Sequence, residues 1–273
     1  MNNYYSGNSE FSHFKEISIQ KSSDAVLFEA VLNAEKIPKR YLENSPFGQG
    51  NAFPSRILVI IRDEFDRPKL YALMEACATM VSSIFRTVWR DSIVFCYNGD
   101  PKYPLSEHHN FLEYLRRNNA ACGLSRVFTD LSDIPLCFDQ ALFAVTTGIR
   151  LDPSAVFFDY EDFYAEHIIH YAERYLPENL LLSPQLSMLC EYDRDKGSSF
   201  VETLRAYLAN INNLNQVADK LHIHRNTLFY RLRKIEDLTG WDLDDGRCLN
   251  NIGLYLRTMD LVSDSTKGVD QNG

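Results

Sequence analysis

The chain has 273 residues, of which 45% are hydrophobic and 24% charged, a composition typical of a globular protein with apolar material for more than one core. Its net charge of −9 at pH 7 argues at first against a nucleic-acid partner. No run of about 18 uninterrupted apolar residues occurs, and the polar N-terminus lacks the pattern of a secretory signal. We therefore expect a cytoplasmic protein that does not bind membranes.

Residues 1–50 are predicted to form an N-terminal segment with one helix. Residues 1–22 are polar and rich in Asn and Ser, which indicates weak order. Apolar residues at helical spacing then predict a helix over residues 22–35. Pro38 and the stretch 44–50, which contains proline and glycine, end this helix before the next element.

Residues 51–162 are predicted to form an α/β sandwich domain. Continuous β-branched apolar runs predict buried strands at residues 56–62 and 92–97. Between them, Pro68 suits the first turn of a helix that we expect to reach Thr87. A helix, a strand, a helix and a strand are expected next, at residues 107–118, 121–128, 134–147 and 155–158. This alternation is typical of helices that cover a sheet.

From Tyr164 onward the sequence predicts helices only, so the fold class expected for the whole chain is α+β. Residues 163–197 are expected to form a connecting helical segment that ends in the charged, glycine-containing stretch 193–199. Residues 198–263 are expected to form an all-α helix-turn-helix domain, and residues 264–273 a disordered tail.

Three helices are predicted in this C-terminal part. Ser199 and Glu202 match the capping-box pattern at the start of the first helix. Asn213 offers cap chemistry for the second, whose buried face is expected to hold Leu214, Val217, Ala218 and Leu221. Residues 222–224 then form a tight turn with Ile223 as an apolar plug, and Gly240 ends the third helix.

The third helix has one apolar stripe and one polar face. Its core stripe is formed by Leu228, Leu232 and Ile235. The opposite face holds Asn226, Tyr230 and Arg233, with Phe229 at its flank, and basic residues lie at the margins. This pattern is typical of a helix that enters the major groove. The residues expected to contact DNA are Arg225, Asn226, Thr227, Phe229, Tyr230, Arg231, Arg233 and Lys234.

The charge distribution supports DNA binding by this segment alone. From Lys220 to Lys234 the sequence holds five basic and no acidic residues, a local charge of +5 that leaves −14 for the rest of the chain. A basic patch on an acidic body suits a protein that contacts phosphate on one face. The alternative is a helical hairpin with a solvated charged face, or a basic helix that binds an acidic protein.

The same segment resembles a known family. The runs Val217-Ala218, Leu221-His-Ile-His-Arg-Asn-Thr-Leu228, Tyr230-Arg-Leu232, Lys234-Ile-Glu236 and Leu238-Thr-Gly240 resemble the C-terminal helix-turn-helix signature of the PucR/CdaR regulators. A weaker resemblance extends upstream through Cys122-Gly-Leu-Ser-Arg126, Asp130-Leu-Ser-Asp-Ile134 and Gln140-Ala-Leu142. Together these segments cover roughly residues 25–262.

The resemblance implies a GGDEF-like middle domain, a relative of diguanylate cyclases that has generally lost catalysis. At the hairpin position of the Gly-Gly-Asp-Glu-Phe motif this chain has Arg90-Asp91-Ser92-Ile93-Val94. Without paired glycines the backbone cannot approach a nucleotide closely, so we expect no enzyme activity and no cofactor. Asp63, Glu64 and Asp66 could contribute carboxylates to an ion site, but we favour a solvated acidic loop and no bound metal.

Histidine and cysteine spacing gives no further metal site. The six cysteines are scattered without a C-x-x-C pair, which favours small buried hydrophobes over disulfides or zinc ligands. His167 and His170 are three residues apart and could share a helical face, but no third ligand follows in a recognisable spacing.

The sequence thus predicts a sequence-specific transcriptional regulator that binds double-stranded DNA as a homodimer through the helix at about residues 224–238. A nucleotide-binding or cyclase-like signalling protein with accessory C-terminal helices is the alternative. Family members usually carry an N-terminal sensory domain, whereas about fifty residues precede the first expected strand here, so a small-molecule effector is left unidentified.

Overall fold

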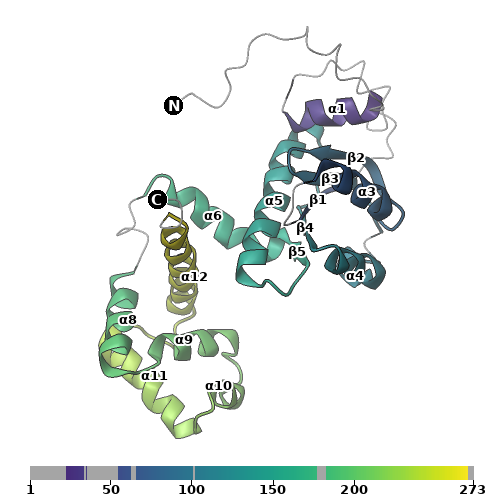
Figure 1. Cartoon of the computed structure of the whole chain (residues 1–273). Coiled ribbons are helices and arrows are strands. Elements are labelled where there is room, and N and C mark those ends of the chain that lie inside the picture. The colour runs from purple at the N-terminus through teal and green to yellow at the C-terminus, as the bar shows by residue number, and fades with distance from the viewer. Residues whose placement is uncertain are drawn as a thin grey trace. The chain divides into compact units, whose positions relative to one another are not determined.

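The computed structural model of the chain describes residues 23–33, 35, 55–62, 66–100, 102–176 and 183–269. The chain divides into two compact units, Met1–Phe163 and Tyr164–Gly273. The first, which we call the α/β unit, holds a sheet with helices, and the described residues of the second, the helical unit, form helices and the turns between them (Figure 1). The predicted α+β fold class is therefore confirmed. No helix within the described ranges is long and apolar enough to cross a membrane.

The α/β unit is built on a five-stranded sheet of order β2-β3-β1-β4-β5. The β4–β5 pair is parallel, and the other neighbouring pairs are antiparallel. The central strand β1 is buried on both faces, which explains its uninterrupted apolar sequence. The strands are β1 (Arg56–Arg62), β2 (Ser83–Trp89), β3 (Ser92–Tyr97), β4 (Ala120–Leu124) and β5 (Phe157–Asp159).

Helices cover both faces of this sheet. Ile57 and Val59 of β1 pack with α1 and α5, whereas Leu58 and Ile60 pack with α3 and α4. This alternation gives two separate hydrophobic cores, one on each face, as the period of two in a strand requires. The helices of the unit are α1 (Ser23–Leu32), α3 (Arg67–Ala78), α4 (His109–Arg117) and α5 (Ile134–Leu151), with short 3-10 turns at Leu105–Glu107, Leu131–Asp133 and Tyr160–Phe163.

The prediction of a helix from Pro68 to Thr87 was wrong in its second half. The helix ends at Ala78, where the hydroxyl of Thr79 donates to the carbonyl of Ala76 at 2.7 Å. Ser83–Trp89 instead forms β2, which pairs with β3 across the two-residue turn Arg90-Asp91. The hydrogen bonds that β2 makes to β3 outweigh the local preference of these residues for a helix. The sequence of residues 83–89 alone does not indicate this pairing.

Other predicted elements differ at their ends. β4 stops at Leu124, and Phe128 makes only an isolated bridge to Ser55. α5 continues to Leu151, four residues beyond the expected end, and β5 begins at Phe157.

The helix of the N-terminal segment belongs to the α/β unit. Phe28 of α1 stacks on Phe85 of β2 with ring centres 5.6 Å apart. The hydroxyl of Thr87 donates to the carboxylate of Glu29 at 2.6 Å. The predicted division at residue 50 therefore cuts through a core, whereas the expected weak order of residues 1–22 lies outside the described residues.

Two glycines allow α5 to lie directly on the sheet. A Cβ at Gly123 of β4 would stand 2.0 Å from the carbonyl oxygen of Ala141, and one at Gly148 would stand 2.1 Å from the ring of Phe158. Neither distance is possible for a real side chain, so the close packing of helix and sheet requires glycine at both positions.

The six cysteines are free thiols, and the prediction that they are buried is confirmed for four of them. Four of them are buried in the cores of the α/β unit, namely Cys77, Cys96, Cys122 and Cys137. Burial raises the pKa of the Cys77 and Cys96 thiols to about 12, because a thiolate is poorly solvated there.

The helical unit has a core of its own, to which α8, α9, α10, α11 and α12 contribute. Leu186 and Leu189 of α8 are buried in it, so α8 is part of this core rather than only a connector. α12 runs to Val269, so the expected disordered tail is helical through that residue, because polar residues can extend a packed helix one hydrogen bond at a time. The helices are α6 (Tyr164–Glu173), α8 (Pro184–Lys196), α9 (Phe200–Ala209), α10 (Leu214–Lys220), α11 (Arg225–Thr239) and α12 (Gly246–Val269).

Candidate nucleic-acid interface

The start of α9 is capped by a residue of the preceding helix. The carboxylate of Asp193, on α8, accepts the backbone N–H of Phe200 at 2.8 Å and that of Val201 at 2.9 Å. The predicted capping box is wrong, since the Ser199 side chain makes no cap hydrogen bond. A charged acceptor that reaches two free N–H groups outcompetes a hydroxyl that could reach one.

The turn between α10 and α11 is held by short-range hydrogen bonds. The side chain of Asn213 caps α10 as predicted, accepting from the N–H of Gln216 at 3.2 Å. After α10, His222 adopts a left-handed backbone (φ 53°), and the half-buried Ile223 donates its N–H to the carbonyl of Ala218 at 3.0 Å. The Nδ1 atom of His224 then accepts from the N–H of Asn226 at 3.2 Å and so caps α11. These bonds fix the angle at which α11 leaves the turn.

The inner face of α11 packs into the helical core as predicted. Leu228 and Ile235 are fully buried, and Leu232 is nearly so. Ala218 of α10 is also buried in this core, as predicted. The helix ends at Gly240, whose left-handed backbone (φ 70°) forms the expected C-cap.

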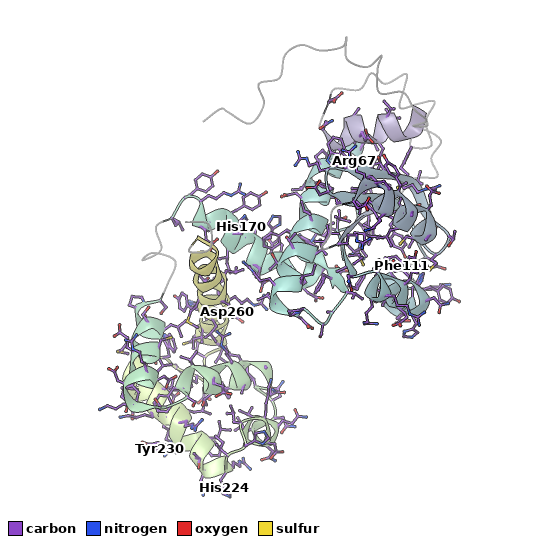
Figure 2. All side chains as sticks on the ribbon, viewed as in Figure 1. Arg67, Phe111, His170, His224, Tyr230 and Asp260 are labelled. Carbon is purple, nitrogen blue, oxygen red and sulfur yellow. The ribbon has the colours of Figure 1, made fainter. Side chains whose placement is uncertain are left out.

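The outer face of α11 is open to solvent. Tyr230 is 64% exposed, and Asn226 and Arg233, on the same face, are also exposed. In Figure 2, His224 and Tyr230 lie at the outer edge of the helical unit. Arg225, Thr227 and Phe229 are exposed as well, so α11 presents six of the eight predicted DNA contacts to solvent.

The two remaining predicted contacts, Arg231 and Lys234, are half-buried. The guanidinium Nη1 of Arg231 donates to the hydroxyl of Thr203 on α9 at 3.2 Å, and Thr203 is fully buried. The sequence placed Arg231 at the helix margin, where phosphate would lie. α9 covers that side of α11, so the Arg231 side chain is engaged within the protein.

Arg225 and Phe229 form a pair on the opposite margin of α11. They are one helical turn apart, and the Arg225 Cζ atom lies 5.3 Å from the centre of the Phe229 ring. This distance is that of a cation–π contact. These two residues were not predicted to contact each other, although the i, i+4 spacing of an arginine and an aromatic residue could have indicated it.

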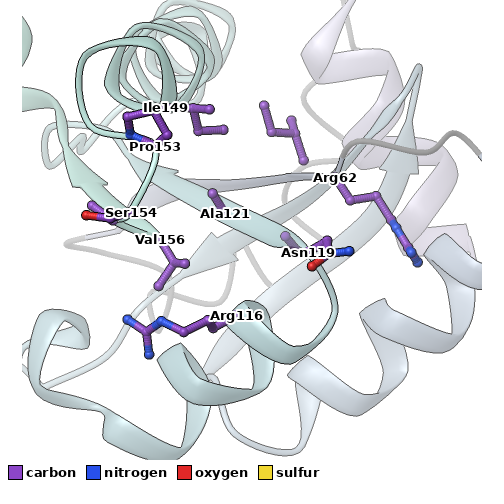
Figure 3. A pocket seen from close by; sticks show the side chains of 11 residues that line it. Arg62, Arg116, Asn119, Ala121, Ile149, Pro153, Ser154 and Val156 are labelled. Atoms are coloured by element: carbon purple, nitrogen blue, oxygen red, sulfur yellow. The ribbon is translucent and has the colours of Figure 1, made fainter.

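A cleft lies in the α/β unit, between the end of α4, β4 and the loop after α5 (Figure 3). The cleft has a volume of about 480 Å³. Among its lining residues, Arg62 has a buried Nε atom without a hydrogen-bond partner in the described structure, and Arg116 pairs with Glu113 at 3.1 Å. The remaining walls include Asn119, Ser154 and apolar side chains.

The structure gives little support to an ion site near β1. Asp66 caps α3 by accepting the N–H of Lys69 at 3.4 Å, and its carboxylate also pairs with the Lys69 ammonium at 3.3 Å. Asp63 and Glu64 lie outside the described residues. Within the described ranges, no group of three or more His, Cys, Asp or Glu side chains could hold a metal ion.

A short helix and a longer one joined by a tight turn, with the longer one exposing a polar face, define a helix-turn-helix domain. Residues 200–258 match the family model of the PucR C-terminal helix-turn-helix domain. The C-terminal part of the chain is therefore a helix-turn-helix domain of the PucR type, and the resemblance is confirmed for that part. The GGDEF-like nature of the α/β unit stays a prediction.

Relatives of known function are bacterial regulators. The purine catabolism regulatory protein of Bacillus subtilis is 30% identical over 157 residues, which cover 54% of this chain and 27% of that protein. The DNA-binding transcriptional activator AdeR of the same organism is 24% identical over 163 residues, 59% of this chain and 39% of that protein. The proline-responsive transcriptional activator PutR, also from Bacillus subtilis, is 36% identical over 74 residues, 27% of this chain and 18% of that protein.

This chain thus spans less than two fifths of the length of each of these relatives. A solved structure of a regulator of polyketide synthase expression from Bifidobacterium adolescentis shares 15% identity with it. That match covers 87% of this chain and 96% of the other, with a TM-score of 0.38, a level of likeness that defines no common fold.

Proposed function

We propose that this protein is a sequence-specific DNA-binding transcriptional regulator that inserts α11 into the major groove. The observation that carries the proposal is the exposed face of α11, where Asn226, Tyr230 and Arg233 project from a helix whose other face is fixed in a core. The match of residues 200–258 to the PucR helix-turn-helix model supports it.

The roles proposed for the exposed residues follow from their chemistry. Asn226 can bond an adenine and Arg233 a guanine through two hydrogen bonds each, which distinguishes these bases from the others. Thr227 is exposed on α11 and Lys220 is exposed at the end of α10. Both are proposed to contact phosphate, which adds affinity without sequence preference. Lys234 is half-buried, and its ammonium is proposed to reach a phosphate from the margin.

The test begins with selection of DNA, because the operator is unknown. Genomic fragments from the host are incubated with the purified full chain, and bound fragments are sequenced and compared. We expect a shared motif, bound at least 10³-fold more tightly than a scrambled duplex at physiological salt. Binding that is equal for selected and scrambled duplexes at every salt concentration would refute sequence-specific recognition.

We further propose that the protein binds DNA as a homodimer. One recognition helix contacts only a few base pairs, and two of them about 34 Å apart on one face of the duplex would supply a full site. Light scattering of the chain, free and on its selected duplex, should give the mass of two chains on DNA. A monomer both free in solution and on the duplex would contradict this.

We propose that the α/β unit does not produce cyclic dinucleotides. The hairpin at the relevant sheet edge turns through Arg90 and Asp91 without glycine, and Arg90 itself takes the left-handed conformation (φ 51°). Incubation with GTP and Mg²⁺ or Mn²⁺ should yield no product above a heat-killed control.

The third possibility, a basic helix that binds an acidic protein, predicts that random DNA and polyglutamate compete equally well for α11. The effector is proposed to be a small molecule of unknown identity.

A further inference from the structure

The Phe229 side chain has no role in the helical core. It is 38% exposed on α11. It belongs neither to the buried residues of the helical core nor to the partly buried residues that pack on that core. Its one ring contact in the described structure is the guanidinium of Arg225. A large apolar ring beside the groove-facing residues therefore has surface available for a partner.

The position of Phe229 on α11 places it among the residues proposed to contact bases. Asn226, Phe229, Tyr230 and Arg233 are spaced i, i+3, i+4 and i+7, so they lie along one side of the helix. Arg225 is the first residue of α11 and lies one turn before Phe229. Both members of the pair thus stand at the end of the helix that is fixed by the His224 cap.

Contact with the ring orients the guanidinium before DNA binds. The Phe229 ring restricts the Arg225 side chain, while the N–H groups at the edge of the guanidinium remain available. A donor fork of this shape matches the O6 and N7 acceptors of guanine. Because the side chain is already ordered, less conformational entropy is lost on binding.

The exposed part of the ring calls for a different contact. Of the groups that bases present in the major groove, the C5 methyl of thymine is the apolar one. An aromatic ring next to the groove floor would bury this methyl group and gain the hydrophobic free energy of its removal from water.

We propose that Arg225 and Phe229 act as one unit that recognises a guanine with a neighbouring thymine. The Arg225 guanidinium donates to O6 and N7 of the guanine, and the Phe229 ring contacts the C5 methyl of the thymine. This inference rests on the proposed function, since it requires α11 to enter the major groove. It assigns Arg225 to base recognition, although a basic residue at the margin of a helix in the groove could instead contact phosphate.

The experiment removes single atoms or groups from the DNA. In the selected duplex, each thymine is replaced in turn by deoxyuridine, which lacks only the methyl group, and each guanine by 7-deazaguanine, which lacks N7. We expect one thymine per half-site at which affinity falls about fourfold, the value of one buried methyl group. At the adjacent guanine, 7-deazaguanine should lower affinity several-fold, within the roughly 5- to 150-fold range of a full bidentate contact.

Protein variants then link these effects to the pair. Phe229→Ala should bind the thymine duplex at least as weakly as wild type binds the deoxyuridine duplex, because it loses the methyl contact and also the ordering of Arg225. Deoxyuridine should weaken its binding no further. Arg225→Ala should lose the penalty for 7-deazaguanine. Arg194→Ala, an exposed arginine on α8 outside the proposed interface, is the control and should keep both penalties. Unchanged far-UV circular dichroism and melting temperature should accompany Phe229→Ala, because the ring is outside the core.

Two failures are distinguishable. A chain that binds no DNA selectively refutes both this inference and the proposed function. Selective binding without any thymine position sensitive to deoxyuridine, or a Phe229→Ala variant that keeps the full deoxyuridine penalty, refutes the thymine–guanine unit alone.

Discussion

The Arg231 guanidinium on α11 donates to the hydroxyl of Thr203 on α9 at 3.2 Å, and that hydroxyl donates in turn to the carbonyl of Ser199 at 2.7 Å. This chain of two hydrogen bonds ties α11 to the start of α9. Thr203 is fully buried, so its hydroxyl needs both partners.

Arg231→Ala should therefore act on stability more than on base preference. We expect a loss of about 1.5–3 kcal/mol in the free energy of unfolding, the value of one hydrogen bond to a charged group. The ratio of cognate to scrambled affinity should change less than twofold. Urea titration and fluorescence anisotropy on both duplexes measure these quantities, with Thr203→Val as the reciprocal variant. Unchanged stability together with an altered base preference would show that Arg231 reaches the groove.

Arg233→Ala should have the opposite pattern. Arg233 is exposed on the outer face of α11, so its loss should cost about 1–3 kcal/mol on the cognate site and less on scrambled DNA. Arg194→Ala on α8, also an exposed arginine, is the control and should leave the specificity ratio unchanged. If Arg233→Ala weakens both duplexes equally, Arg233 contacts phosphate instead.

Leu228→Ala should destabilise the helical unit by about 2–5 kcal/mol, because the side chain is fully buried among α9, α10 and α11 and its removal leaves a cavity. Leu254→Ala on α12 makes the same chemical change at a position that is 46% exposed and should cost less than about 0.5 kcal/mol. Equal losses in chemical denaturation would contradict the burial pattern of α11.

The sequence predicted this site well where the contacts are local. The core stripe of α11, the Asn213 cap and the Gly240 end follow from spacing along one helix and were found without a structure. The Asp193 cap and the Arg231 bond join different helices. The position of α9 determines which margin of α11 is covered. The spacing of residues along α11 alone does not predict that position.

The same distinction explains the fold predictions. β1 and β3 were found because they are buried on both faces and therefore apolar throughout. β2 was missed because it contains the exposed Arg86 and follows a helix without an intervening glycine or proline. Its strand conformation depends on the hairpin with β3, a contact between separate segments.

Gly123→Ala should disrupt the α/β unit, because the added methyl would overlap the carbonyl oxygen of Ala141 and force α5 away from β4. We expect a melting temperature lowered by at least 5 °C, or no soluble folded protein. Gly253→Ala in α12 places the same methyl where nothing lies within 4 Å, and should stabilise by about 0.4–1 kcal/mol. A Gly123→Ala variant that melts like wild type would contradict the close packing of α5 and β4.

The buried thiols should make the α/β unit sensitive to alkali. Burial raises the pKa of Cys77 and Cys96 to about 12 and that of Cys137 to about 11, whereas an unfolded cysteine titrates near about 8.5. Above that pH the unfolded state releases protons that the folded state retains. The stability contribution is therefore complete below about pH 8.5 and is lost progressively up to about pH 12.

Urea titrations at pH 8 and pH 10 should show this loss for the α/β unit. Thiol alkylation of the native chain at pH 8 provides an independent measurement. The half-buried Cys248 should react first, and Cys77, Cys96 and Cys137 only on unfolding. Rapid alkylation of all six thiols in the native chain would contradict the raised pKa values.

Asp193 connects the end of α8 rigidly to the start of α9. Its backbone belongs to α8, while its carboxylate is bonded to two successive N–H groups of α9. A tilt of α8 therefore turns α9 with it instead of being absorbed by the short segment between them. Since the Arg231–Thr203 hydrogen bond connects α9 to α11, a movement of α8 would be passed on through α9 to α11 and its exposed side chains.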